Sequence, residues 1–237
     1  MATDLSRRRF VSTLGAGTAS LAAASTLAAP AAAATPAAAG LKILGIACSL
    51  RAGKTTAQAV QLCLDAAQSV APERIEIELI ELAGLSIPTQ PAAKLPVPAG
   101  QQDDFPQIEA KLSDPQLAAI VVGTPVYYAN MSALCKALIE RCGVFRNNDF
   151  ALSGKVAGVI AVGAARNGGQ ELVIRSVQAS LMCHEMLVIG DGRPTSHFGG
   201  TLWNDGKDDI SKDEFGVKTA QNLGKHVARV ALARHPA

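Results

Sequence analysis

The 237-residue chain carries 22 Lys and Arg residues against 20 Asp and Glu residues. Residues 1–39 contribute three arginines and one aspartate, which leaves 19 basic and 19 acidic residues in the remainder. This balance leaves no basic field to attract nucleic acid or an anionic membrane, and about 200 residues suit one domain with its own core.

The first 39 residues have the pattern of an export signal. Ser6–Phe10 is a twin-arginine pattern, and Val11–Ala29 is a weakly apolar run of mostly small and hydroxylated residues. Few large apolar side chains argue against a stable membrane anchor, and the arginine pair followed by an apolar run argues against a disordered cytoplasmic tail. We therefore expect residues 1–39 to be a twin-arginine signal peptide and Ala/Pro-rich linker, and the protein to be periplasmic or otherwise extracytoplasmic.

From Lys42 onward, short apolar stretches alternate with stretches of helical periodicity. Strands are predicted at Ile43–Ala47, Ile75–Leu82, Ala118–Val122, Lys155–Val162 and Met186–Ile189. Helices are predicted at Lys54–Ser69, Gln107–Leu112, Met131–Arg141, Gln170–Cys183 and from a cap at Ser211 to about Ala233. This alternation predicts that residues 40–237 form a doubly wound α/β domain with a five-stranded parallel sheet, for which 2-1-3-4-5 is the leading strand order.

The first loop of interest is Ser49–Thr56, which leads from the first strand into a helix. Its hydroxyls, backbone N–H groups and helix dipole favour a phosphate, whereas the alternative is a plain helix cap with surface cations. A nucleoside-triphosphate loop requires glycine five positions before Gly53, and Cys48 stands there. The G-x-G-x-x-G dinucleotide fingerprint is also missing.

The second loop lies within Val121–Gly143. Gly123-Thr124-Pro125 is expected to end the third strand, and Gly143 to cap the following helix. Between them stand Tyr127 and Tyr128, the only tyrosines of the chain. Ligands bind at the carboxyl ends of strands in open α/β sheets, so this pair is a candidate for ligand contact. Packing of two half-buried tyrosines beside the proline is the alternative.

The third loop, Gly163–Gly169, follows the fourth strand. Its glycines permit close backbone approach to a flat ligand, and a flexible turn with a surface arginine is the alternative. Strands one, three and four are neighbours in the predicted order. The three loops should therefore converge at one edge of the sheet.

Cysteines and histidines give no sign of a metal or triad site. None of the five cysteines shows C-x-x-C spacing, so most are expected to be small core residues. A twin-arginine cargo folds in the reducing cytoplasm, so unpaired cysteines are compatible with export. Of the four histidines only His197 lies in a plausible active-site loop, and an ordinary loop residue is the favoured interpretation there.

Together these loops carry a family resemblance. The segments SLRAGKTT, GTPVYYANMSALCKALIERCG, GAARNGGQE and HFGGTLWNDGKDDI resemble the NAD(P)H-dependent FMN reductase family of flavodoxin-like proteins, near its multimeric flavodoxin and iron–sulfur flavoprotein branches. The resemblance spans about Leu41 to the C-terminus. The compact cysteine motif of the iron–sulfur branch is missing, so no cluster and no metal is expected.

The resemblance implies a flavodoxin-like fold that binds FMN. The FMN phosphate would lie at the first loop, and the flavin ring would lie against the second and third loops. The implied cofactor-binding residues are Ser49, Arg51, Lys54, Thr55, Thr56, Pro125, Val126, Tyr127, Tyr128, Ala129, Asn130, Ala165, Arg166, Asn167, Gly168 and Gly169.

The function implied is an FMN-dependent oxidoreductase. It would take hydride from NAD(P)H and reduce a quinone, flavin, metal ion or other small acceptor. The alternative is an exported electron-transfer flavoprotein that serves a protein partner without NAD(P)H activity of its own. Relatives are commonly dimers or tetramers, so a homodimer or homotetramer is expected, with the long loops Ala83–Pro106 and Gly190–Ile210 as candidate contacts.

Overall fold

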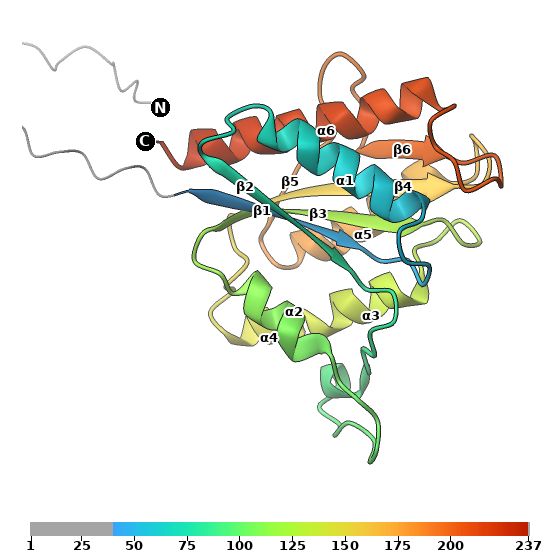
Figure 1. The fold of residues 1–237 in the computed structure, drawn as a ribbon. Coiled ribbons are helices and arrows are strands. Elements are labelled where there is room, and N and C mark those ends of the chain that lie inside the picture. Colours follow the sequence, from blue (N-terminus) through green and yellow to red (C-terminus); the bar gives the residue numbers. More distant parts are fainter. Residues whose placement is uncertain (1–39, 237) are drawn as a thin grey trace, which may run out of the picture. The chain divides into compact units, whose positions relative to one another are not determined.

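The computed structural model describes residues 40–236, which form a parallel sheet with helices on both faces (Figure 1). The strand order β2-β1-β3-β4-β5 confirms the predicted order. The strands are β1 (Leu41–Ala47), β2 (Ile75–Glu81), β3 (Leu117–Pro125), β4 (Val156–Gly163), β5 (Leu187–Val188) and β6 (Gly200–Trp203). The predicted signal peptide lies outside the described residues. None of the helices within 40–236 has the length and apolar character to cross a membrane.

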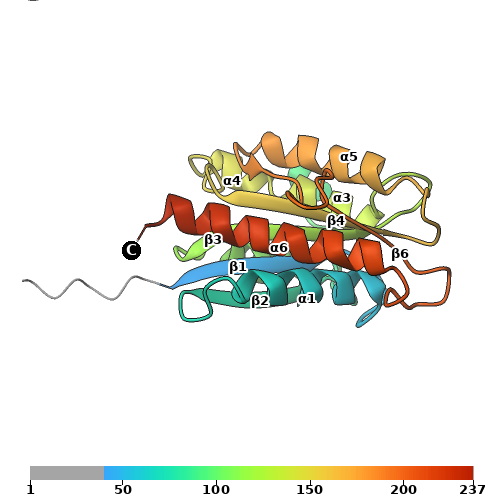
Figure 2. The ribbon, with the colours of Figure 1, turned by 90° about the horizontal axis from the view of Figure 1, so that it is seen from above.

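The helices divide between the two faces of the sheet, as the view from above shows (Figure 2). Helices α1 (Thr55–Gln68) and α6 (Glu214–Arg234) cover one face, where Val60, Leu64 and Val227 are fully buried. The other face is covered by α2 (Phe105–Leu112), α3 (Ala133–Arg141), α4 (Gly143–Asn147) and α5 (Gln170–Met182). Burial on both faces explains the continuous apolar runs of β3 and β4.

Two elements differ from the sequence prediction because of long-range contacts. Strand β6 lies inside Gly190–Ile210, which was expected to be a loop, and it pairs in parallel with Ile160–Gly163 of β4. Strand β5 pairs only with Val156 and Ala157, so the second half of β4 would otherwise have an open edge. Strand β3 continues through Gly123–Pro125, where a stop was expected, since these residues pair with β4.

The predicted helix caps were also wrong at two positions. Gly143 does not end a helix but begins α4, and α3 ends on Cys142 in a right-handed conformation. The cap of α6 is Asp213 and not Ser211, because the Asp213 carboxylate accepts a hydrogen bond from the Gly216 N–H at 2.8 Å.

The loop between β2 and α2 is partly ordered by its own contacts. It contains the 3₁₀ helix η1 (Gln90–Ala93), and α2 begins at Phe105, two residues before the predicted start. Arg141, only 8% exposed, donates to both carboxylate oxygens of Asp103 at 2.9 Å and to the Pro88 carbonyl at 2.8 Å. Its guanidinium also lies over the Phe105 ring. One buried cation therefore ties both ends of this loop to α3.

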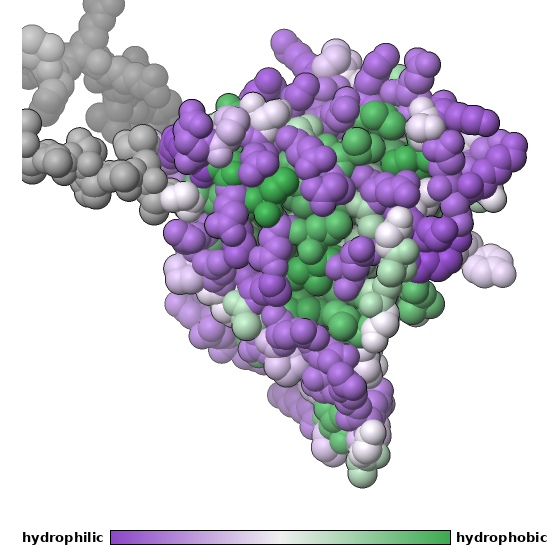
Figure 3. Space-filling model, viewed as in Figure 1, coloured by the Kyte–Doolittle hydropathy of each residue, from purple (hydrophilic) through white to green (hydrophobic). Residues whose placement is uncertain are grey.

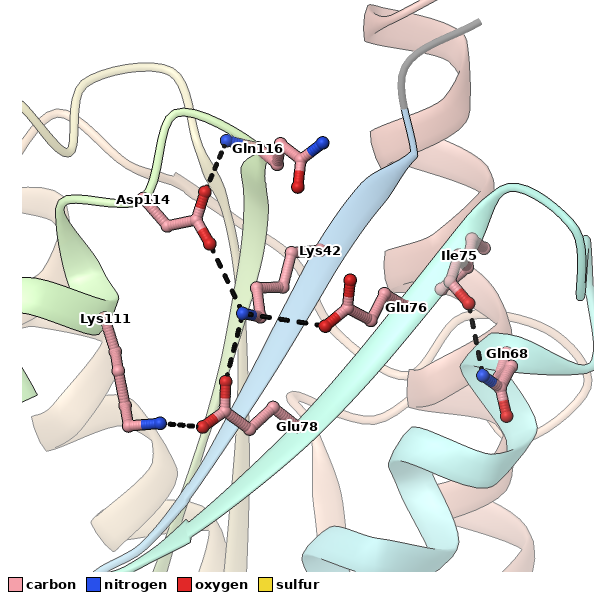
Figure 4. A network of polar contacts seen from close by, with 8 residues as sticks. All are labelled: Lys42, Gln68, Ile75, Glu76, Glu78, Lys111, Asp114 and Gln116. Atoms are coloured by element: carbon pink, nitrogen blue, oxygen red, sulfur yellow. Dashed lines mark hydrogen bonds and ion pairs between the residues drawn. The ribbon is translucent and has the colours of Figure 1, made fainter. Parts of the chain in front are cut away.

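The opposite end of the sheet from the three loops carries a polar network (Figure 4). The Nζ atom of Lys42, in β1, lies 3.1 Å from Glu78 Oε2 and 3.3 Å from Asp114 Oδ2. Lys111 of α2 also pairs with Glu78. The hydrogen bond from Lys111 holds the pKa of Glu78 below its ordinary value. These pairs fasten edge strand β2 to β1 and α2.

The face beside β2 is otherwise hydrophilic with an apolar band in its middle (Figure 3).

All five cysteines are free thiols, and only Cys183 is exposed. The prediction that most are core residues is confirmed. Burial raises the pKa of Cys142 to about 12.

Candidate functional site

The first loop presents buried hydroxyl groups at the start of α1. Ser49 is 5% exposed, and Thr55 and Thr56 are 3% exposed each. Helix α1 begins at Thr55 without any side-chain cap on its first N–H groups. Ser49 Oγ accepts a hydrogen bond from the Arg51 N–H at 3.1 Å, which shapes the turn. Hydroxyls and helical N–H groups at one helix start are donors for an anion.

The second loop is a strained tight turn after β3. Tyr127 and Asn130 exchange two backbone hydrogen bonds, each 2.9 Å long, and the residues between them have φ of 51° (Tyr128) and 57° (Ala129). Two successive left-handed residues define a type I′ turn, which normally uses Asn and Gly. The tyrosine side chains are exposed, Tyr127 by 46% and Tyr128 completely. Strain of this kind concentrates at functional sites.

Contacts join the three loops at one edge of the sheet, as the sequence predicted. Ser132, the cap of α3, donates from its Oγ to the Cys48 carbonyl at 2.6 Å and so ties the second loop to the first. Gly169 ties the third loop to the second, since its φ is 102° and a Cβ there would lie 3.1 Å from Ala129 Cα. Only glycine permits this approach.

The Arg166 side chain contacts residues outside the three loops. Its guanidinium forms an ion pair with Asp213 and lies 5.4 Å from the centre of the Trp203 ring. Asp213 is fully buried and also accepts a hydrogen bond from the backbone N–H of Trp203 at 2.9 Å. Arg166 therefore fixes the third loop against the segment that follows β6.

That segment contributes site residues that sequence reasoning missed. Asn204 donates from Nδ2 to Thr55 Oγ1 at 3.3 Å, and the Asp208 carboxylate binds both Arg51 and Lys54. Glu81, at the end of β2, accepts from the Gly53 N–H at 2.7 Å. The acidic run after Trp203 was visible in the sequence, but its position beside the first loop depends on β6, which was not predicted.

His197 lies beside the third loop. Its Nδ1 is 3.6 Å from the buried Asp191 carboxylate, and its ring meets Phe215 edge to face at 5.4 Å. Together with Asn167 and Gly169 of the third loop, these rings line a pocket of about 430 Å³. An ordinary loop residue stays the favoured prediction for His197.

The donor set at the first loop fits the phosphate of FMN in kind. Three buried hydroxyls and the first N–H groups of α1 can bind a phosphate without a large charge. The two cations of the loop fit less directly, because both contact Asp208. No group of three or more His, Cys, Asp or Glu residues within 40–236 is arranged to hold a metal ion.

Comparison with known proteins agrees with this reading. The family model of NADPH-dependent FMN reductases matches residues 41–200. An iron–sulfur flavoprotein of Methanocaldococcus jannaschii is 37% identical over 193 residues, which cover 80% of this chain and 97% of that protein. An NAD(P)H dehydrogenase (quinone) of Chromohalobacter salexigens is 28% identical over 175 residues, covering 66% and 82% of the two chains.

Solved structures share the fold. An oxidoreductase from Corynebacterium diphtheriae superposes with a TM-score of 0.62 at 18% identity, covering 82% of this chain and 98% of that one. A WrbA-like flavodoxin from Agrobacterium tumefaciens gives a TM-score of 0.55 at 16% identity, covering 84% and 99%. The flavodoxin-like fold is thereby confirmed. The chain belongs to the NADPH-dependent FMN reductase family of oxidoreductases.

Proposed function

We propose that the protein is an FMN-dependent oxidoreductase that takes hydride from NADH or NADPH and reduces a small acceptor such as a quinone, a flavin or a metal ion. The observation that carries the proposal is the junction of three loops at the carboxyl edge of β1, β3 and β4. It combines buried hydroxyls at a helix start with a strained, exposed tyrosine turn. Family membership supports the same chemistry.

Each part of the junction has a separate task in this proposal. Ser49, Thr55 and Thr56 bind the phosphate through hydroxyl and N–H donors. The close approach of Gly169 to Ala129 brings the second and third loops together, and a flat ring rests against both of them in this proposal. FMN, when bound, supplies the hydride and electron chemistry, and the protein supplies binding, orientation and nearby donors.

The tyrosine turn is the part left open to a second ligand. Tyr127 and Tyr128 project from it with large exposed fractions, so they can shape the place where a nicotinamide or an acceptor approaches. A planar acceptor such as a quinone or a flavin can stack on these exposed aromatic rings.

The deciding experiment is a spectrum of the purified mature protein followed by rapid mixing with NADH and with NADPH. A flavin absorption band that bleaches rapidly with either nucleotide supports the proposal. Protein that stays colourless after addition of FMN would refute it. Bound FMN that neither nucleotide reduces would favour the alternative, an exported electron-transfer flavoprotein that serves a protein partner.

Export and assembly are also proposals. We propose that the protein folds with FMN in the cytoplasm and crosses the membrane by the twin-arginine route. We also propose that it forms a homodimer or homotetramer. Binding to the folded state alone contributes about 2.7 kcal/mol when the ligand is a hundredfold above its Kd, which favours loading before export. Replacing Arg7 and Arg8 with lysine should leave an FMN-containing precursor inside the cell. Unchanged export of that variant would contradict the route, and light scattering of the mature protein gives the oligomer.

The name of the relative from Methanocaldococcus jannaschii raises the question of an iron–sulfur cluster. We propose that this chain carries none, because the segment from Ala83 to Pro106 and the rest of the sequence lack a compact cysteine motif. The four buried cysteines lie in the hydrophobic core. Iron and acid-labile sulfide in the purified protein would contradict this.

A further inference from the structure

The segment between β6 and α6 lies across the first loop and is held at both ends. At one end the Asn204 N–H donates to the Gly163 carbonyl at 3.0 Å, and its side chain reaches Thr55. At the other end Ile210 is buried among residues of α1 and α6. Residues 205–207 between them are exposed, and Asp205 and Asp208 have left-handed backbone conformations. This segment, residues 204–210, is called the strap below.

Asp208 is the point where the strap contacts the cations of the first loop. Its carboxylate pairs with Arg51 through two contacts, Nη1–Oδ2 at 2.9 Å and Nη2–Oδ1 at 2.7 Å. Lys54 Nζ lies 3.6 Å from the same carboxylate. The Arg51 hydrogen bond, followed by the charges of both cations, holds the pKa of Asp208 below its ordinary value. The residue is therefore ionised at neutral pH.

The donors that Asp208 uses are those a phosphate would use. A guanidinium group binds carboxylate and phosphate with the same forked geometry. Arg51 and Lys54 are the only cations between residues 49 and 56. Glu81 adds a second carboxylate at this loop by accepting from the Gly53 N–H. The loop thus contacts two carboxylates from other elements, and of these Asp208 pairs with its two cations.

We propose that Asp208 is a specificity-determining residue that competes with the flavin phosphate for Arg51 and Lys54. It thereby lowers the affinity for FMN relative to riboflavin, which has the same ring and no phosphate. The inference rests on the proposed FMN site. Its consequence is that the strap sets how tightly the phosphate is held, whereas the second and third loops set how tightly the ring is held.

The test compares Asp208→Asn with wild type by titrating each apoprotein with FMN and with riboflavin. Binding is monitored by the quenching of flavin fluorescence. The variant removes the charge but keeps the shape of the side chain. We expect the Kd for FMN to fall by about threefold to tenfold at low ionic strength, because a partly exposed charge next to a dianion is lost. High salt should shrink the difference, and the Kd for riboflavin should stay unchanged.

Asp209→Asn is the matched control. It lies in the same strap, but its carboxylate accepts from the Ser211 N–H at 2.8 Å and not from the first loop. An FMN affinity that is unchanged or weaker in Asp208→Asn would overturn the proposal, because the carboxylate would then orient Arg51 and not compete for it. Equal gains for FMN and riboflavin, or equal gains in the control, would overturn it too. Failure of the wild-type protein to bind any flavin would instead refute the proposed function.

Discussion

The strained turn after β3 permits a test of whether the site is built at the expense of stability. Tyr128 has φ of 51° and a completely exposed side chain, so its truncation removes no packing. A left-handed residue other than glycine costs about 1–2 kcal/mol, and glycine loses about 0.5–1 kcal/mol more conformational entropy on folding. Tyr128→Gly should therefore raise the free energy of unfolding by about 0.5–1 kcal/mol.

Tyr128→Ala is the matched variant, because alanine keeps Cβ and hence the strain. Urea unfolding should show that the free energy of unfolding is larger for the glycine variant than for the alanine variant. Thermal unfolding should give the glycine variant a melting temperature a few degrees higher, at about 2–4 °C per kcal/mol for a domain of this size. Both should bind FMN more weakly than wild type if the ring serves the site. A glycine variant no more stable than the alanine variant would refute the left-handed turn in solution.

Three further predictions concern stability, each measured by unfolding. Gly224→Ala should lower the free energy of unfolding by several kcal/mol (~3 or more), because the added Cβ would lie 1.9 Å from the Cys63 carbonyl oxygen and force α6 off α1. A loss under about 1 kcal/mol would contradict this packing. Asp103→Asn should cost about 1.5–3 kcal/mol at neutral pH. Arg141 lowers the pKa of Asp103 in the folded state, so this contribution is present above about pH 4 and is lost as pH falls toward the folded-state pKa; an equal cost at pH 7 and pH 2 would refute the pairing. Burial lowers the pKa of His184, so wild type should lose stability as pH falls below about 6.5 while the unfolded chain takes up the proton, and His184→Leu should flatten that slope; an unchanged slope would refute it.

The sequence by itself determined the class of fold and the three predicted loops. Apolar strands alternating with amphipathic helices have few packing solutions, and the right-handed crossover leaves 2-1-3-4-5 as the natural order for five strands. The loops were recognisable because glycine, hydroxyl and tyrosine residues follow buried strands directly. These signals are local, since each depends on a few neighbouring residues.

Only the tertiary structure decided how the site is completed. Strand β6 has four residues and no periodicity, and it forms because β5 leaves half of β4 without a partner. From there the strap brings Asp208 to Arg51 across 157 positions of sequence. Local propensity contains no information on such a pairing, because the energy of an ion pair depends on distance in space and the distance is set by the sheet.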